Sequence, residues 1–369
     1  MKLILLTFAL LFSGCFSTLL EEKGQVTTTD LLPTERENAA YHFEKLKMVN
    51  ETTGWAMNDQ GKIRYTKDGW ETSLDITPEQ LPAYENIQSF FVLNEKSVWI
   101  FYISDKSNQF EEFITNDSGQ TWKHQTISSI NDPGIADVNF TDEKTGFLFT
   151  SFNHEIHGLE PHQLYKTEDG GLSWKVLSPQ GLNTSSYKWI HFTNDMSGWS
   201  IGENIKKGTD RIDPTTTKLF ETQDGGLSWK SHVLIKTINE QGIDYKSPIF
   251  FNGSGLLHAV QYPLYDDNGI GKLYTFEYGL KNPNWKLKGV VDFPFKRDDV
   301  KQSAFPFFKP ENIVIDFVDM NNGWFITNNE MYTTNNGGQS WLKVNDTLSF
   351  PSQINIQFLT VNVGFSFHY

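Results

Sequence analysis

An eight-residue pattern recurs in this chain and constrains its fold more than any other feature. The pattern, Thr-x-Asp-x-Gly-x-Thr/Ser-Trp, is complete in TNDSGQTW (115–122), TEDGGLSW (167–174) and TQDGGLSW (222–229). The aspartates of the last two copies are 55 residues apart. Repetition at such an interval indicates that one structural unit is copied several times along the chain.

Three further segments retain part of the pattern. TNNGGQSW (334–341) has asparagine in the aspartate position, TKDGWETS (66–73) lacks the tryptophan, and FEYGLKNPNW (276–285) retains little beyond Trp285. In a hairpin loop the aspartate can accept hydrogen bonds from the loop's own amides, the glycine can take a positive φ, and the tryptophan can cover the hairpin. The residues predicted to have this structural role are Asp68, Asp117, Trp122, Asp169, Trp174, Asp224, Trp229, Asn336 and Trp341.

Each copy follows two predicted strands that are joined by a tight turn ending in glycine and an aromatic residue, as in VNFTDEKTGFLF and IHFTNDMSGWSI. With one more strand on each side of the loop, a unit has four short antiparallel strands in about 50 residues, which is typical of a β-propeller blade. Units begin near Tyr41, Asn86, Ile135, Tyr187, Pro248 and Asn312.

The chain is therefore expected to be an all-β propeller of four-stranded antiparallel blades. After the sixth unit, INIQFLTVNVGFSFHY supplies two more strands. Because a ring should not leave an open strand edge, we favour seven blades, with the segment before Tyr41 completing the seventh. Six blades and a partial one are the alternative.

The repeats resemble the Asp-box (BNR) repeats of sialidases, sortilin-type receptors and Ycf48-type photosystem II assembly factors, and are most similar to the last group. The resemblance covers residues from about 40 to 369. It implies a propeller, but it implies no particular activity, because unrelated proteins share this loop as a scaffold element.

The N-terminus, MKLILLTFALLFSGC, has Lys2, an apolar stretch and a small pair of residues before Cys15. This arrangement predicts an export signal over residues 1–14. Its end resembles a bacterial lipobox, which implies lipidation of Cys15 and a location on the outer side of the cell membrane. Residues 15–38 are predicted to be a flexible tether, and residues 39–369 the propeller.

Loops within and between the units are longest on the face opposite the repeated loops, over units two to five and before unit six. Function is usually carried where loops are built out. The connector 286–311 combines basic and aromatic side chains, which is typical of a protein interface. Its phenylalanines could instead fill the space between blades. The candidate partner-binding residues are Phe293, Phe295, Lys296, Arg297, Lys301, Phe305, Phe307 and Phe308.

Another loop places His154, His157 and His162 close together. Imidazoles can bind zinc, but this spacing matches no zinc motif, so a solvated loop is the favoured interpretation. We expect no metal and no cofactor.

Sialidase chemistry requires three arginines that grip a carboxylate, and the only arginines here are Arg36, Arg64, Arg211 and Arg297. No convergent triad is visible among them, so we expect no enzyme, and no catalytic residue is assigned. The net charge of −14 argues against nucleic acid. The sequence favours a monomeric binding or scaffold protein for an extracytoplasmic or membrane protein, with a glycan-binding protein, or less favoured a sialidase-like hydrolase, as alternatives.

Overall fold

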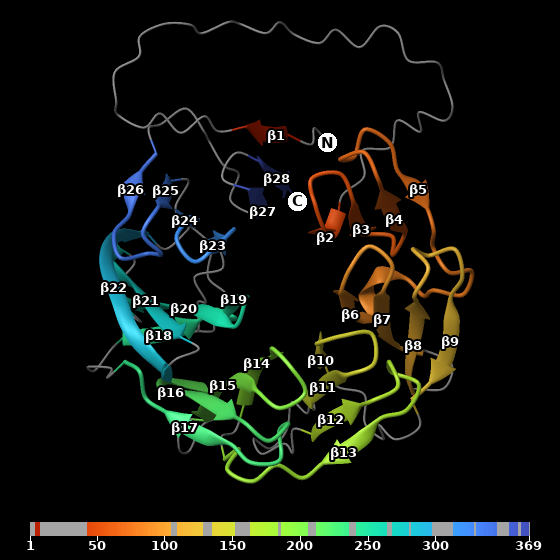
Figure 1. Cartoon of the computed structure of the whole chain (residues 1–369), viewed down its shortest axis with the longest axis horizontal. Coiled ribbons are helices and arrows are strands. Elements are labelled where there is room, and N and C mark those ends of the chain that lie inside the picture. Colours follow the sequence, from red (N-terminus) through yellow and green to blue (C-terminus); the bar gives the residue numbers. More distant parts are fainter. Residues whose placement is uncertain are drawn as a thin grey trace, which may run out of the picture.

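The strands of this chain form antiparallel sheets around a central axis, as Figure 1 shows. The structure is a computed structural model, and it describes residues 4–7, 43–104, 109–127, 135–151, 163–183, 186–205, 212–235, 241–263, 268–279, 282–296, 313–327, 330–344, 354–360 and 363–368. The predicted all-β propeller with four-stranded antiparallel blades is confirmed.

Six sheets have at least four strands, and we number them as blades one to six in chain order. Blade one has β2 (Phe43–Met48), β3 (Gly54–Asn58), β4 (Ile63–Thr66) and β5 (Leu74–Asp75). Blade two follows the short 3-10 helix η1 (Tyr84–Asn86) and has β6 (Ile87–Val92), β7 (Val98–Ile103), β8 (Phe110–Thr115) and β9 (Lys123–Thr126). Blade three has β10 (Ile135–Phe140), β11 (Gly146–Ser151), β12 (Gln163–Thr167) and β13 (Lys175–Leu177).

The remaining blades follow the same order, with the first strand nearest the axis and the last on the outside (Figure 1). Blade four has β14 (Ser186–Phe192), β15 (Gly198–Ile205), β16 (Ile212–Thr222) and β17 (Lys230–His232). Blade five has β18 (Gln241–Tyr245), β19 (Ile249–Phe251), β20 (Ser254–Pro263), β21 (Asn268–Gly279) and β22 (Asn282–Lys296). Blade six has β23 (Val314–Phe317), β24 (Gly323–Thr327), β25 (Glu330–Thr334) and β26 (Leu342–Lys343).

Blade five departs from the predicted unit. Its innermost position is shared by β18 and β19, which pair with successive parts of β20. The blade therefore begins at Gln241 and not near Pro248 as expected. Pro248 lies in the break between the two short strands, where a residue without an N–H removes no ladder hydrogen bond.

The seventh sheet has only three strands, β27 (Ile354–Thr360), β28 (Val363–His368) and β1 (Ile4–Thr7). The favoured prediction of seven four-stranded blades is therefore wrong for the described residues, which form six such blades and a partial one, as in the alternative prediction. β1 lies within the predicted export signal and pairs antiparallel with β28, so cleavage of that signal would remove β1 and leave β27 paired with β28.

Side chains link the three-stranded sheet to the blades on both sides. The amide of Phe358 in β27 donates to the carboxylate of Asp316 in blade six at 2.6 Å. The side-chain amide of Gln357 bonds both the N–H and the carbonyl of Met48 in blade one, each at 2.8 Å. These bonds place β27 between the last blade and the first.

The same type of bond joins blades three and four around the axis. The amide of Ile190 donates to Asp137 at 2.7 Å, and the amide of Phe192 donates to Asn139 at 2.8 Å. Burial raises the pKa of Asp137 to about 6, although these amide bonds favour its charged form. Half-buried polar side chains thus take up backbone donors that the innermost strands leave unpaired.

Close packing explains the glycine before the aromatic turn residue. In blades three, four and six a phenylalanine ring on the first strand lies against this glycine on the second, and a Cβ on Gly146 would lie 2.5 Å from the Phe140 ring. Gly198 meets Phe192 in the same way, at 2.6 Å. In blade one Met48 lies against Gly54 instead. A side chain at these positions would force the blade apart.

The repeated loops form the hydrogen bonds that the sequence predicted. We call the segments 66–73, 115–122, 167–174, 222–229 and 334–341 clasp loops. In the third, Asp169 accepts hydrogen bonds from the Ser173 amide at 2.8 Å, the Ser173 hydroxyl at 2.6 Å and the Thr167 hydroxyl at 2.8 Å. The Thr167 oxygen in turn accepts from the Gly171 amide at 2.9 Å. In blade six the Asn336 side-chain oxygen likewise accepts from the Thr334 hydroxyl and the Ser340 amide, but its side-chain NH₂ donates to the Ser340 hydroxyl at 2.8 Å.

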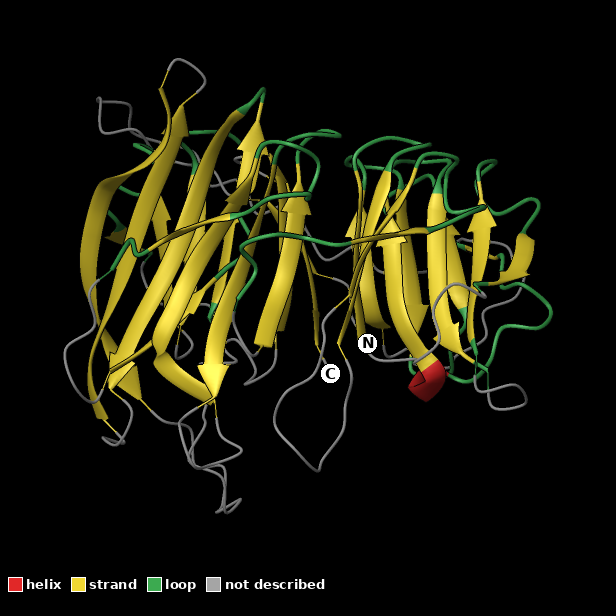
Figure 2. Ribbon diagram, turned by 90° about the horizontal axis from the view of Figure 1, so that it is seen from below, coloured by secondary structure: helices red, strands yellow, loops and turns green. Residues whose placement is uncertain are grey.

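Each clasp loop also bonds the turn between the first two strands of its own blade. The Gly170 amide donates to the Lys144 carbonyl at 2.8 Å, and the Gly225 amide donates to the Met196 carbonyl at 2.8 Å. Clasp loops and turns therefore share one face of the propeller, the clasp face, which Figure 2 shows edge-on at the top of the ring. Connections between blades lie on the other face, the long-loop face.

The clasp-loop tryptophans do not simply cover their own hairpins, as we expected. Trp174 is 6% exposed and lies edge-on to Phe101 of blade two and Phe140 of blade three. Trp122 donates from Nε1 to the Ile76 carbonyl in blade one at 2.9 Å. Each ring thus fills the seam with the preceding blade, where apolar area is buried from both sides.

Replacing Asp169 with alanine should lower the free energy of unfolding by about 1 kcal/mol, because it removes a three-bond acceptor at an exposed site where water can partly replace it. Asp169→Asn should lower the free energy of unfolding by less, since Asn336 accepts the corresponding hydrogen bonds in the clasp loop of blade six. Urea denaturation of both variants measures the difference. Equal losses in the two variants would contradict this role for the carboxylate.

Candidate functional site

Only part of the predicted partner-binding patch lies in the described residues. Phe293 is 2% exposed and packs against Phe325 of blade six, with ring centroids 5.2 Å apart. It therefore belongs to the core, and its prediction as a surface contact is wrong. Phe295 and Lys296 end β22, but their side chains lie outside the described residues. The same holds for the whole of Arg297, Lys301, Phe305, Phe307 and Phe308.

Cys15 and the histidines at positions 154, 157 and 162 also lie outside the described residues. Within the described ranges, no group of three histidine, cysteine, aspartate or glutamate side chains is placed to hold a metal ion. No helix in these ranges is both long and apolar enough to cross a bilayer.

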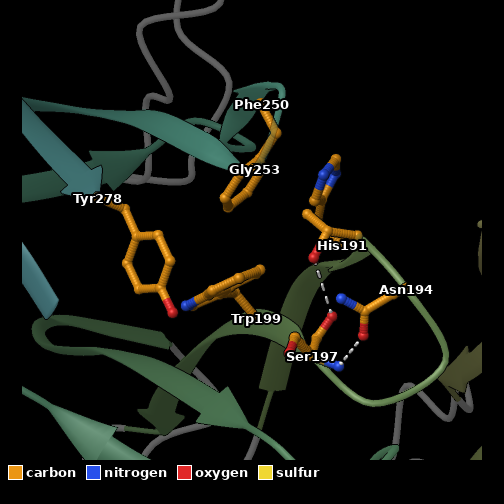
Figure 3. Close-up of a pocket in the computed structure, with 8 residues that line it drawn as sticks. His191, Asn194, Ser197, Trp199, Phe250, Gly253 and Tyr278 are labelled. Carbon is orange, nitrogen blue, oxygen red and sulfur yellow. Dashed lines mark hydrogen bonds between the residues drawn. The ribbon is translucent and has the colours of Figure 1, made fainter. Parts of the chain in front are cut away.

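A cavity of about 340 Å³ opens on the clasp face between blades four and five. Figure 3 shows the side chains around it. Blade four supplies the end of β14, the following turn and the start of β15, and blade five supplies the turn after β19 and the end of β21. The lining residues are His191, Thr193, Asn194, Ser197, Trp199, Phe250, Gly253 and Tyr278.

The described part of blade five has no clasp loop beside this cavity. In blade three, Thr167 pairs with Gly146 and begins the loop. In blade five, Tyr278 pairs with the corresponding Gly255 and has no hydroxyl at Cβ to accept the loop's amide. β21 continues to Gly279 and β22 starts again at Asn282, so the two strands meet in a tight hairpin.

The loss of the clasp leaves Trp199 uncovered. The equivalent tryptophan of blade two, Trp99, donates from Nε1 to the carbonyl of Gly170 in the next blade's clasp loop at 2.8 Å. Trp199 is 1% exposed, and its Nε1 has no hydrogen-bond acceptor among the described residues. The same is true of the buried Nε1 atoms of Trp55, Trp174, Trp285 and Trp341, but among these five tryptophans only Trp199 lines the cavity. A buried N–H without an acceptor can still donate to a group that enters beside it.

Three aromatic rings form one wall of the cavity. Trp199 stacks on Phe250 at 4.7 Å and lies edge-on to Tyr278 at 5.3 Å between centroids. His191 stacks on the other side of Phe250 at 5.4 Å. Burial lowers the pKa of His191 to about 4, so its imidazole is neutral at physiological pH.

Two turns form the opposite, more polar rim. The Asn194 side-chain oxygen accepts from the amides of Met196 and Ser197 at 2.9 and 2.8 Å, which fixes the turn of blade four. The turn of blade five has only Asn252 and Gly253, with φ of 50° and 81°. Since both values are positive, this is the shortest kind of hairpin turn, and it leaves the cavity open beside it.

The sequence contains a signal for this site in FEYGLKNPNW (276–285), the weakest copy of the repeat. Leu280 stands in the aspartate position, and Lys281 and Asn282 stand where blade three has two glycines. The loss of those three residue types predicts the loss of the clasp.

No family model and no curated protein matches this sequence. Among solved structures, the chain is similar to "YCF48 bound to D1 peptide", with 12% identity, a TM-score of 0.51 and coverage of 89% of this chain and 91% of that one. It is similar to YCF48 from Cyanidioschyzon merolae, with 15% identity, a TM-score of 0.50 and coverage of 89% and 98%. A polysaccharide lyase of family PL25, an ulvan lyase, is similar at 12% identity, a TM-score of 0.50 and coverage of 85% and 84%.

At these identities the likeness shows the propeller fold alone. The similar structures include a peptide-bound propeller and an enzyme. The fold therefore does not decide between binding and catalysis, and the choice depends on the chemistry of the site.

Proposed function

We propose that this protein is a non-enzymatic binding propeller that holds a segment of another extracytoplasmic or membrane protein. The cavity between blades four and five carries the proposal. Its lining offers aromatic faces and the buried Trp199 donor, and none of its eight residues has a carboxylate, an ammonium or a guanidinium. Glycoside hydrolysis generally depends on a pair of carboxylates, whereas this lining suits an uncharged group that is only held.

Export and lipidation at Cys15, with a tether over residues 15–38, complete the proposal by placing the propeller on the outer side of the cell membrane. The Asp-box character of the repeats, and similarity in fold to a propeller whose structure has a bound peptide, support a scaffold role. Such a role includes help with the assembly or stability of a membrane complex. The long-loop face, with the basic and aromatic connector beyond Lys296, is the proposed second contact with the partner.

A cell-surface glycan is the second candidate ligand. Trp199, Phe250 and Tyr278 line the cavity with aromatic rings, and tryptophan and tyrosine faces are common platforms for sugar rings. A glycan would be expected to bind there without a protein partner.

Cross-linking in intact membranes tests the function. The native chain should capture a protein, and the triple variant Arg297→Ala, Phe307→Ala, Phe308→Ala should capture much less of it while its thermal unfolding is unchanged. The matched control replaces Leu172 and Leu227 with alanine, since both are exposed apolar residues on the clasp face, at 49% and 54%. This control should capture as much as the native chain.

A chain with Cys15→Ser should leave the membrane fraction, and its retention there would contradict the lipid anchor. Equal capture by the triple variant would contradict the long-loop face as the contact. Capture of no protein by any form would overturn the protein-binding function in favour of a glycan.

A further inference from the structure

Two seams between blades have the same construction up to a point. Trp99 stacks on Phe140 with centroids 3.8 Å apart, and Trp199 stacks on Phe250 at 4.7 Å. In both seams the phenylalanine pairs with a glycine at or next to the start of the following strand, Phe140 with Gly146 and Phe250 with Gly255. A second tryptophan also lies beside the phenylalanine in each seam: Trp174 is 5.8 Å from Phe140, and Trp285 is 6.0 Å from Phe250 and also 6.0 Å from Trp199.

The seams differ in what covers the first tryptophan. Over Trp99 lies a turn of peptide backbone with two glycines, Gly170 and Gly171, both of positive φ. Over Trp199 lies the cavity. The structure thus contains, two seams away, a peptide group that complements this kind of site.

We propose that the cavity between blades four and five binds a glycine-containing turn of another polypeptide, whose backbone carbonyl accepts the hydrogen bond from Trp199 Nε1. This rests on the proposed function in that the turn belongs to a protein partner. Figure 3 shows Trp199 on the cavity wall together with Phe250 and Tyr278, whose ring centroids lie 4.7 and 5.3 Å from that of Trp199.

Packing around the blade-three loop explains the preference for glycine. A Cβ on Gly171 would lie 3.3 Å from Trp99 Nε1, and one on Gly170 would lie 2.6 Å from the Glu143 carbonyl. Their φ values of 96° and 76° also disfavour any residue with a side chain. A turn that approaches Trp199 as closely as this loop approaches Trp99 also lacks space for a Cβ and also requires positive φ values.

Size and charge of the cavity agree with such a ligand. Its volume of about 340 Å³ is small for a ligand site, which suits a few residues and not a long chain. The lining is uncharged, so a backbone carbonyl can bind there without stripping water from a charged side chain of the cavity. The wall of Trp199, Phe250 and Tyr278 can pack against an apolar flank of the turn.

A peptide with the sequence of residues 166–175, KTEDGGLSWK, is a suitable probe because it is the blade-three clasp itself. It is titrated into the full chain labelled with ¹⁵N at tryptophan, and the indole N–H signals are followed by NMR. The Trp199 signal, assigned by its absence in Trp199→Phe, should shift in a saturable way. A peptide with valine in place of both glycines should bind about tenfold more weakly or not at all.

Two variants of the chain make the test specific. Trp199→Phe keeps an aromatic wall but removes the donor, and the peptide should bind about tenfold more weakly. Trp324→Phe is the matched control, because Trp324 is the equivalent turn residue of blade six, stacks on Phe358 at 3.9 Å and does not line the cavity. Binding to this control should be unchanged.

A third variant restores the missing clasp with Tyr278→Thr, Leu280→Asp, Lys281→Gly and Asn282→Gly. The loop of the chain itself should then fill the site, so peptide binding should be lost and thermal stability should rise.

No saturable shift of the Trp199 signal, or equal binding of the valine peptide, would overturn the inference. Saturation of this signal by chitobiose and not by the peptide would overturn it in favour of a glycan. If the peptide fails while cross-linking in membranes still captures a protein, the inference falls and the proposed function stands.

Discussion

Replacing Trp99 with alanine should lower the free energy of unfolding by about 3–5 kcal/mol. The indole is fully buried, stacks on Phe140 of the next blade at 3.8 Å and donates to the Gly170 carbonyl at 2.8 Å. Its removal opens a cavity in the seam between blades two and three and also leaves a buried carbonyl without a partner. Urea denaturation, followed by fluorescence or circular dichroism, measures the loss.

Phenylalanine at the same position separates the two contributions. Trp99→Phe keeps most of the packing but leaves the Gly170 carbonyl unpaired, so it should cost about 1–3 kcal/mol. Trp199→Phe is its matched control, because Trp199 is buried to the same degree and has no acceptor to lose. The control should cost less than Trp99→Phe. Equal costs would mean that the hydrogen bond to the clasp loop adds nothing to stability.

The second large effect is a pH dependence of stability that arises from Glu112. This side chain is fully buried in blade two, and burial raises its pKa to about 8, even though the Gln125 amide donates to it at 2.6 Å. The charge of Asp169 adds to the rise. Glu112 is therefore mostly protonated in the folded protein at neutral pH, but it is ionised in the unfolded chain.

The sign follows from proton binding. Between the unfolded pKa, near 4.5, and the folded pKa, about 8, the folded state holds one more proton than the unfolded state. The free energy of unfolding should therefore fall as pH rises through this range, by up to about 1.4 kcal/mol per pH unit. Burial raises the pKa values of Asp137 and Asp316 to about 6. These two groups therefore also make the free energy of unfolding fall with rising pH, but only below about pH 6.

Glu112→Gln tests this assignment, because the amide is neutral at every pH and its oxygen can still accept from Gln125. The slope of stability between pH 6 and pH 8 should nearly disappear, and the variant should be more stable than the native chain at pH 8. Glu168→Gln is the control: hydrogen bonds and charges from Lys175 and Lys166 lower the pKa of this exposed carboxyl, so it leaves that slope unchanged. A slope that persists in Glu112→Gln would assign the dependence to another group.

The sequence by itself determined the architecture of the single blade. The Thr-x-Asp-x-Gly-x-Ser pattern predicted a loop in which one carboxylate binds amides and hydroxyls nearby, and Asp169 does so with Ser173, four residues away. The alternation around each glycine-aromatic turn predicted the strands. These interactions are local, so the residues that form them are close in the chain and their pattern can be recognised without the fold.

The tertiary structure decided what happens between blades. The sequence left open whether the phenylalanines of the connector 286–311 bind a partner or fill the space between blades. The structure placed Phe293 in the core. It showed that the last strands form a three-stranded sheet beside blade one, joined through Gln357 to Met48, a residue 309 positions away.

The cavity shows the same limit most clearly. The weak repeat copy that ends at Trp285 is visible in the sequence, but its effect appears on the neighbouring blade, at Trp199. Trp99 donates to the Gly170 carbonyl of an intact clasp loop, whereas Trp199 has no such acceptor among the described residues. Seams join side chains from different repeats, and the Trp99 and Gly170 pair is 71 residues apart. A repeat pattern fixes what lies within one copy, whereas the contacts between copies, and any site formed where one copy fails, depend on how the sheets pack in space.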